Sequence, residues 1–250
     1  MSIFKARGII IKENLVGDND KSLIVLLKDY GKFTIWARNC RNGKSKLLVG
    51  ATLFSYADFI IYDNGKTLSL NQIDMIENFY SLTEDLDSLA YSTYFLEFLD
   101  KNTQEATPIN DTMLLLLKSL LILSKTTTIS PKLIAKIFEI KFLQLNGYTP
   151  VISNCTYCNE DIKNNQDLYW GINGVVCNKC KKKEENLLKI SYNVLLVLDR
   201  ILSSDLDNLY KFNVSDNILD KLSLISKKLL REHLYINLKS ASFIEQIENM

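Results

Sequence analysis

The sequence predicts an α+β multidomain chain, in which a small N-terminal β-barrel is followed by a mostly α-helical domain that carries an inserted four-cysteine motif. Three observations lead to this prediction. The first part of the chain has short apolar runs closed by turn residues, the rest has apolar residues three and four apart, and two Cys-x-x-Cys pairs interrupt the second pattern. We therefore expect domains at 1–80 and 81–250, with the insertion at 150–184.

Five strand-like runs predict the barrel, at 8–12, 22–28, 32–38, 59–62 and 67–70. Asp29-Tyr30-Gly31 separates the second run from the third, and Asp63-Asn64-Gly65-Lys66 separates the fourth from the fifth. A glycine-containing turn between two strand-like runs predicts the first hairpin, and Asn-Gly, which suits the positive φ angles of tight turns, predicts the second. A small sheet removes its exposed edges by closing on itself, and the five-stranded closed form is the OB-fold, a common platform for oligonucleotides.

Helical spacing begins near residue 81 and predicts helices within 86–99, 114–121, 133–145, 194–202 and 218–230. Ser130-Pro131 gives the third helix an N-cap and a first-turn proline, and Asn146-Gly147 supplies its stop. The most apolar stretch, 113–123, contains Lys118 and has about half of the ~20 residues that a membrane-spanning helix needs. We interpret it as a buried core helix and expect no membrane partner.

The charge is unevenly distributed along the chain. The formal net charge is +1, but residues 1–50 hold ten cations against four anions, so this segment carries +6 and the remainder −5. Four of the cations fall in an acid-free run at 37–46 that is rich in turn formers: Arg38, Arg41, Lys44 and Lys46. A basic loop on a barrel can pair with phosphates and release counterions, so we predict these four as DNA-contacting residues. The alternative is a solvated loop.

Two aromatic residues precede this loop on the third predicted strand. Phe33 and Trp36 could stack on bases without reading their sequence. They could equally fill the barrel core, as most strand aromatics do.

The cysteines form the most specific motif. Two Cys-x-x-Cys pairs, Cys155 with Cys158 and Cys177 with Cys180, are separated by eighteen residues, within the ~15 to 20 typical of four-cysteine zinc sites. Four thiolates fill a tetrahedral shell and leave no open position, so we expect one structural Zn²⁺ in a zinc-ribbon-like motif. Free buried thiols and a redox Cys-x-x-Cys are the alternatives. Cys40 is interpreted as a small loop residue.

Lysines 181–183 follow the last of these cysteines, but Glu184-Glu185 comes directly after them, so they are a weaker nucleic-acid candidate. Five cysteines is an odd number and no leader-like segment opens the chain, so we expect a reducing cytoplasm rather than a secreted disulfide framework.

Nothing in the sequence predicts an enzyme. The nucleotide-binding motifs GxxxxGK[ST] and GxGxxG are missing, as are the hydrolase motifs HExxH and GxSxG. A single histidine, His233, makes a Ser-His-Asp or Cys-His arrangement improbable, and we interpret it as a surface or capping side chain.

The order of these parts resembles the bacterial RecO recombination mediator family over essentially the whole chain. The residues that carry the resemblance are Gly8-Ile9-Ile10, Asp20-Lys21-Ser22, Tyr30-Gly31-Lys32, Ala37-Arg38, Arg41, Lys44-Ser45, the segment 155–180, Leu238-Lys239-Ser240 and Phe243. Three positions depart from the family pattern. Asn39 stands where glycine is usual, which is tolerable because Asn also adopts left-handed geometry. Asn42-Gly43 replaces the usual Arg-Pro, and Ala241 replaces a usual basic residue; both changes remove positive charge at those spots.

The resemblance implies a non-enzymatic DNA repair protein of the RecF pathway, located in the cytoplasm with the nucleoid. Such a protein binds single- and double-stranded DNA, anneals complementary strands and helps load recombinase onto coated single-stranded DNA. The implied partners are RecR, the single-stranded-DNA-binding protein through its acidic C-terminal tail, RecF and the recombinase. Two other hypotheses remain: a zinc-stabilised protein-interaction scaffold, and an RNA- or ribosome-associated OB-fold protein.

Overall fold

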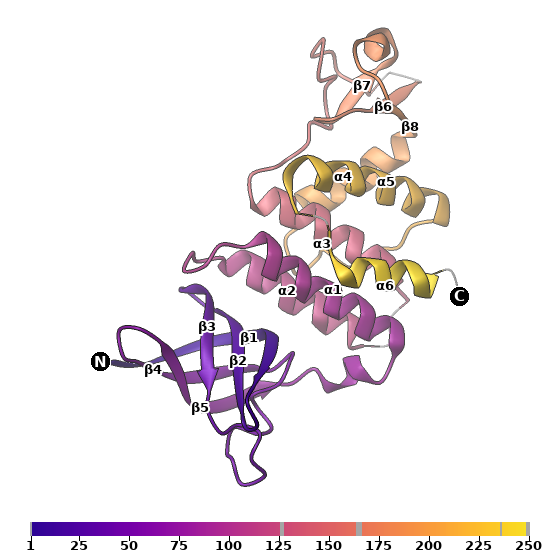
Figure 1. The fold of residues 1–250 in the computed structure, drawn as a ribbon. Coiled ribbons are helices and arrows are strands. Elements are labelled where there is room, and N and C mark those ends of the chain that lie inside the picture. The colour runs from indigo at the N-terminus through magenta and orange to yellow at the C-terminus, as the bar shows by residue number, and fades with distance from the viewer. Residues whose placement is uncertain (1, 126–127, 164–166, 236, 249–250) are drawn as a thin grey trace. The chain divides into compact units, whose positions relative to one another are not determined.

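The computed structural model describes residues 2–125, 128–163, 167–235 and 237–248 (Figure 1). Contacts divide the chain into two compact units. The first unit comprises Met1–Lys125 together with Asn237–Met250, and the second comprises Thr126–Ile236. The domains predicted from the sequence, 1–80 and 81–250 with an insertion at 150–184, were defined by the spacing of apolar residues and not by contacts. They stay a prediction. None of the helices in the described residues is long and apolar enough to cross a membrane.

The first unit opens with a closed five-stranded barrel, as the sequence predicts. Its strands, in the spatial order β1-β2-β3-β5-β4, are β1 (Ser2–Val16), β2 (Asp20–Leu27), β3 (Gly31–Ala37), β4 (Tyr56–Asp63) and β5 (Leu68–Glu77). Both predicted hairpins are present, since β2 pairs antiparallel with β3 and β4 pairs antiparallel with β5. A parallel pairing of β3 with β5 at Ile35↔Leu68 and Trp36↔Ser69 closes the barrel. The topology is that of an OB-fold.

β1 is longer than the sequence predicts, with fifteen residues instead of the run at 8–12. It pairs with β2 on one edge and β4 on the other, so both edges are satisfied along much of its length. A register shift between Ile10 and Lys12 bends the strand.

Alternate residues of the strands point into the barrel, where a core of aliphatic side chains surrounds Phe59. Cys40, Leu47 and Ala51 join this core from the loop between β3 and β4. The interpretation of Cys40 as a small loop residue is therefore incomplete, because its side chain is 1% exposed and anchors the loop in the barrel. Burial raises the pKa of the Cys40 thiol.

Three α-helices belong to the same unit as the barrel: α1 (Leu86–Asn102), α2 (Asn110–Leu123) and α6 (Lys239–Glu248), with the 3₁₀ turn η1 (Tyr80–Thr83) before them. α1 and α2 match the predicted runs at 86–99 and 114–121. The side chain of Asp85 caps α1 by accepting a 2.8 Å hydrogen bond from the backbone N–H of Ser88.

α1 in turn caps the last helix. The Glu97 carboxylate accepts hydrogen bonds from the backbone N–H groups of Lys239 at 3.2 Å and Ser240 at 2.8 Å, and from the Ser240 hydroxyl. These are orphan donors of the α6 N-terminus. The sequence did not predict α6, a helix of ten residues with none of them buried. Its capping by Glu97 depends on residues about 140 positions apart.

The β2–β3 turn joins the barrel to these helices. Gly31 has φ +95°, and a Cβ there would lie 2.2 Å from the carbonyl oxygen of Thr107. The Lys32 ammonium is buried and donates to the carbonyl oxygen of Asp100 at 2.6 Å. Asp29 and Asn110 exchange two hydrogen bonds. This contact explains why the turn requires glycine at position 31.

The second unit contains α3 (Pro131–Leu145), α4 (Tyr192–Ser203) and α5 (Asp216–His233). The predicted start and stop of α3 are confirmed: Ser130 Oγ accepts from Leu133 N at 3.3 Å, and Gly147 follows the helix with φ +87°. Lys141 is buried and donates to the terminal carbonyl groups of α4, those of Ile201, Leu202 and Ser204.

Between α3 and α4 the chain forms a small antiparallel sheet. Its strands are β6 (Leu168–Trp170), β7 (Val175–Cys177) and β8 (Leu188–Ile190), in the order β7-β6-β8. The 3₁₀ helix η2 (Asn178–Lys183) lies between β7 and β8 in the chain. We call residues 151–190 the four-cysteine module; it carries the β6, β7 and β8 labels in Figure 1.

Candidate nucleic-acid interface and metal centre

The four predicted DNA-contacting residues lie on one exposed loop. Residues 38–55 connect β3 to β4, and the side chains of Arg38, Arg41, Lys44 and Lys46 are all exposed there. None of these four cations forms an ion pair with a carboxylate of the described residues. Arg41 Nη1 donates only a long 3.4 Å hydrogen bond to the carbonyl oxygen of Gly17.

The other cations of residues 1–50 have a different environment. Five of them pair with carboxylates at 4 Å or less: Lys5, Arg7, Lys12, Lys21 and Lys32. Three of the acids that neutralise them come from outside this segment, namely Asp58, Asp74 and Asp100. Lys28 is the remaining cation of the ten. The charge that stays unpaired in the described structure is therefore concentrated on the β3–β4 loop.

The Arg7–Asp58 pair illustrates this neutralisation. Arg7 Nε donates to Asp58 Oδ1 at 2.7 Å, and Lys5 Nζ lies 3.2 Å from the other oxygen. The hydrogen bond from Arg7, together with that from Lys5, lowers the pKa of Asp58 to about 2. Lys5 and Arg7 are thus held by an internal carboxylate and are poorly placed to bind a phosphate.

The basic loop is fixed at its base by the turn between β1 and β2. Asp20 Oδ1 accepts a 2.7 Å hydrogen bond from the backbone N–H of Asn39, and the backbone N–H of Arg41 donates to the carbonyl oxygen of Asn19 at 3.0 Å. Lys21 Nζ donates to the carbonyl oxygen of Ala51 at 2.8 Å. The loop thus has an ordered base and an exposed basic outer side.

Asn39 occupies the backbone conformation expected for it. Its φ is +51°, in the left-handed region that asparagine tolerates better than most residues other than glycine. Sequence reasoning noted Asp20 and Lys21 but assigned them no role. Their position before β2 gave no signal of a contact with residues 39 and 51, because that contact depends on the barrel.

The two aromatic residues of β3 lie on opposite faces of the strand. Phe33 packs against the barrel core, so for this residue the core alternative is correct. Trp36 is an odd number of residues further along, so its side chain lies on the outer face, where it is half-buried between Ser22 of β2 and Ser69 of β5. Of these two aromatic residues, Trp36 is the one on the outside of the barrel.

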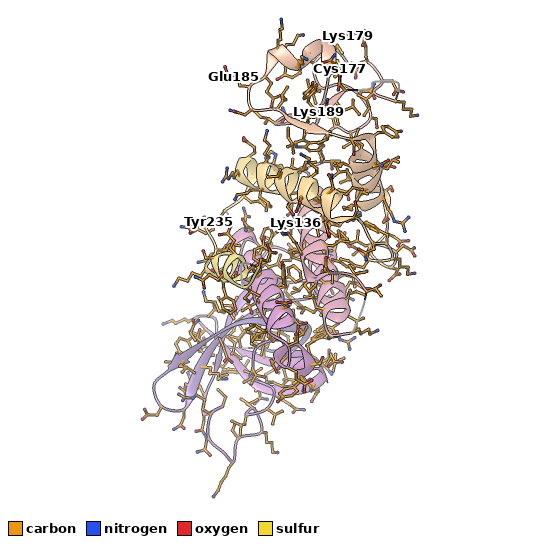
Figure 2. All side chains as sticks on the ribbon, turned by 90° about the vertical axis from the view of Figure 1, so that its right-hand side faces the viewer. Lys136, Cys177, Lys179, Glu185, Lys189 and Tyr235 are labelled. Atoms are coloured by element: carbon orange, nitrogen blue, oxygen red, sulfur yellow. The ribbon has the colours of Figure 1, made fainter. Side chains whose placement is uncertain are left out.

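The four predicted metal ligands come together. Their Sγ atoms all lie within 4.8 Å of one another, and those of Cys158 and Cys177 are 3.7 Å apart. A tetrahedral ion with metal–sulfur bonds of about 2.3 Å needs sulfur atoms about 3.8 Å apart. The backbone N–H of Cys177, a residue labelled in Figure 2, also donates a hydrogen bond to Cys155 Sγ at 3.4 Å. A hydrogen bond of this kind favours the thiolate form of Cys155. The donor set therefore fits a metal ion that prefers four thiolates.

The acidities of the thiols agree with this reading of the site. Burial alone would raise the pKa of Cys155, but N–H donors of Cys177, Tyr157 and Cys158 outweigh it and lower the pKa to about 6. Burial, followed by its contacts with the other thiols, raises the pKa of Cys180 to about 12. Sulfur atoms this close cannot all ionise unless a cation offsets their charge.

The chain reversal between β6 and β7 brings the cysteines together. Gly174 has φ +137°, and a Cβ there would lie 2.0 Å from the carbonyl oxygen of Val151. The backbone N–H of Thr156 donates to the carbonyl oxygen of Val175 at 2.9 Å. These contacts hold the first cysteine pair beside the strand that delivers the second pair.

His233 is not one of the residues of the sulfur cluster. It is half-buried at the end of α5 and stacks on Tyr148, with ring centroids 4.4 Å apart. It therefore lies in the last turn of α5, partly at the surface, and also packs on an aromatic ring.

Comparisons with known proteins match the entire chain. A family model described as Recombination protein O N terminal matches residues 1–79, and one described as Recombination protein O C terminal matches residues 83–242. The chain is 32% identical to the DNA repair protein RecO of Acetivibrio thermocellus, over 100% of this chain and 99% of the relative. It is 27% identical to the DNA repair protein RecO of Alkaliphilus metalliredigens, over 98% of this chain and 100% of the relative. It is 28% identical to the DNA repair protein RecO of Listeria monocytogenes, over 98% of this chain and 94% of the relative. The chain belongs to the RecO family of DNA repair proteins.

Proposed function

We propose that this protein is a non-enzymatic recombination mediator that binds single- and double-stranded DNA without sequence preference. The observation that carries the proposal is the concentration of unpaired cations on the anchored β3–β4 loop of an OB-fold barrel: Arg38, Arg41, Lys44 and Lys46. Side chains without a carboxylate partner can pair with phosphates at no cost of breaking an ion pair. Trp36, on the outer face of β3, offers a ring on which a base can stack.

Annealing of complementary strands is the activity that this chemistry supports. Contacts to phosphates fix a strand without reading its bases, so the bases stay free to pair with a second strand. No covalent bond is made or broken in annealing, so the activity needs no catalytic residues. We further propose that the protein helps load recombinase onto coated single-stranded DNA, with RecR, RecF and the acidic C-terminal tail of the single-stranded-DNA-binding protein as partners. Such a protein works in the cytoplasm, at the nucleoid.

We also propose that Cys155, Cys158, Cys177 and Cys180 hold one structural Zn²⁺. The proposal is supported by four sulfur atoms within 4.8 Å and by the absence of any other ligand type in the set. Zn²⁺ with four thiolates has a filled shell, so its contribution is to the stability of the module and not to a reaction.

The decisive experiment titrates labelled single-stranded DNA with the full chain at several salt concentrations. Neutralising ~4 to 6 phosphates predicts a log–log slope of about −3 to −4. Oligonucleotides of unrelated sequence should give the same slope, and two complementary strands should anneal faster with the protein than without it. A slope near zero, or no binding at low salt, would overturn the proposal in favour of a protein-interaction scaffold. Tighter binding to RNA of the same sequence would favour an RNA-associated role instead.

A further inference from the structure

The four-cysteine module exposes three consecutive lysines on η2. Lys181, Lys182 and Lys183 are all exposed, directly after Cys180, whose buried Sγ belongs to the sulfur cluster. In a 3₁₀ helix successive side chains point about a third of a turn apart. The cluster therefore fixes the start of a short segment from which three cations project.

Two of these lysines are held over aromatic rings. Lys181 Nζ lies 5.8 Å from the centroid of the Tyr169 ring, and Lys183 Nζ lies 5.7 Å from that of Tyr157. Contacts of this kind are weak where water has access, so they orient a cation without neutralising it. The Tyr157 side chain remains 42% exposed.

Glu184, which follows the lysines in the sequence, forms no ion pair of 4 Å or less with them in the described residues. Glu184 Oε1 accepts from the backbone N–H of Ile172 at 2.7 Å, and Oε2 accepts from the Tyr157 hydroxyl at 3.0 Å. Its carboxylate packs so closely on Gly171 that a Cβ there would lie 2.3 Å away. Glu184 is therefore part of the internal structure of the module.

Two other acids of the module pair with other lysines. Glu160 pairs with Lys179 at 3.0 Å, and Asp167 pairs with Lys189 at 2.7 Å. The side chains of Lys179, Lys189 and Glu185 are labelled in Figure 2. In the described residues, none of the lysines 181–183 forms an ion pair of 4 Å or less with a carboxylate.

We propose that lysines 181–183, with the rings of Tyr157 and Tyr169, form a second phosphate-binding surface for single-stranded DNA. The combination of unpaired cations and accessible aromatic rings is the chemistry that binds single strands without sequence preference. An annealing protein has to hold two strands, and this surface lies in the second unit whereas the basic loop lies in the first. The inference rests on the proposed function, since it assigns a second site for the same ligand.

The test compares two triple charge reversals within the second unit. K181E/K182E/K183E removes the proposed surface, and K211E/K221E/K227E makes the same change of charge at lysines outside the module. We expect both variants to keep the zinc content and melting temperature of the wild-type chain. The first variant should reduce the magnitude of the log–log salt slope for single-stranded DNA by about 2, because each phosphate contributes about 0.7. Its annealing rate should fall at least several-fold below that of the control.

The outcomes separate this inference from the proposed function. If the wild-type chain itself fails to bind single-stranded DNA, the proposed function is wrong. If the wild-type chain binds and anneals but the two triple variants behave alike, only the second surface is wrong. A glutamate-rich peptide serves as the competing probe: if the first variant loses its binding to that peptide while its DNA slope is unchanged, the lysines contact an acidic protein partner and the inference is overturned.

Photocrosslinking gives an independent readout. Single-stranded DNA containing 5-bromouracil should crosslink to the peptide that contains Tyr157, and Tyr157→Leu should abolish that crosslink while zinc is retained. Crosslinks confined to the first unit would contradict the proposal.

Discussion

The backbone N–H of Asn39 donates a 2.7 Å hydrogen bond to Oδ1 of Asp20, and this contact joins the basic loop to the first residue of β2. The loop would otherwise have to be ordered when DNA binds, and that ordering would reduce affinity. We therefore expect Asp20 to act as a positioning residue, which need not contact the DNA itself.

Removing the Asp20 acceptor should release the base of the loop. We expect Asp20→Ala to speed hydrogen exchange at the backbone N–H of Asn39 and to weaken binding to single-stranded DNA by about five-fold, the equivalent of one hydrogen bond of about 1 kcal/mol. Asp20→Asn keeps an acceptor oxygen and should retain most of the affinity. Equal affinity of the alanine variant and the wild-type chain would show that the loop needs no anchor at this point.

Charge reversal on the loop should weaken DNA binding without destabilising the fold. R38E/R41E should reduce affinity for single-stranded DNA at least ten-fold at low salt, because two phosphate contacts become repulsive. Both side chains are exposed, so the free energy of unfolding should change by no more than ~0.5 kcal/mol. R38K/R41K keeps the charge and is the matched control. A large loss of stability in urea unfolding would mean that these side chains are structural.

Loss of one sulfur ligand should release the metal. We expect Cys158→Ser to lose zinc and to unfold the four-cysteine module, since a structural zinc site typically supplies ~10 kcal/mol or more to a small fold. Elemental analysis and hydrogen exchange across β6, β7 and β8 provide the measurements. Cys40→Ala is the control, because Cys40 lies in the barrel core and should leave one zinc ion per chain. Freshly purified wild-type protein without zinc would refute the site.

Glu97 should make the docking of α6 sensitive to acid. Burial works to raise the pKa of Glu97, but the donors of Ser240 and Lys239 outweigh it and hold the pKa below its ordinary value. A carboxylate whose pKa is lowered by folding stabilises the folded state above its unfolded pKa of ~4.3, and this contribution is lost as the pH falls through the folded value.

We therefore expect α6 to be capped fully at neutral pH and to loosen below pH ~4. Amide NMR signals of Lys239 and Ser240 should follow this transition. Glu97→Gln should show a loosened α6 at neutral pH and no acid transition in these signals, and an unchanged transition in that variant would assign it to another group.

Gly31→Ala should destabilise the first unit. Alanine at φ +95° is strained, and its Cβ would lie 2.2 Å from Thr107 O. We expect a loss of at least about 2 kcal/mol in urea unfolding, from backbone strain and a clash together. Gly65→Ala is a matched control, because Gly65 has φ +84° and no atom within 4 Å of the added Cβ. A similar loss of unfolding free energy in both variants would show that the contact between Gly31 and Thr107 does not contribute to stability.

Features that depend on neighbours in the chain could be read from the sequence. The Gly31 and Asn64-Gly65 turns predicted the hairpins, Ser130-Pro131 predicted the start of α3, and the spacing of the two Cys-x-x-Cys pairs predicted the sulfur cluster. The turn and cap signals each lie within a few residues, so local backbone preference sufficed to place them. The cysteine cluster was predicted instead from the separation of the two pairs, which is typical of four-cysteine metal sites.

The tertiary structure decided which side chains are available. Arg7 and Arg41 are alike in the sequence, but Arg7 meets Asp58, fifty-one residues away, whereas Arg41 has no carboxylate partner among the described residues. The direction of Glu184 and the capping of α6 by Glu97 likewise depend on residues distant in the chain. The sequence by itself determined most of the strands and helices, the grouping of the four cysteines and the basic composition of the loop. Only the fold determined which charges stay without a carboxylate partner, because ion pairs form between residues that folding brings within about 4 Å of each other.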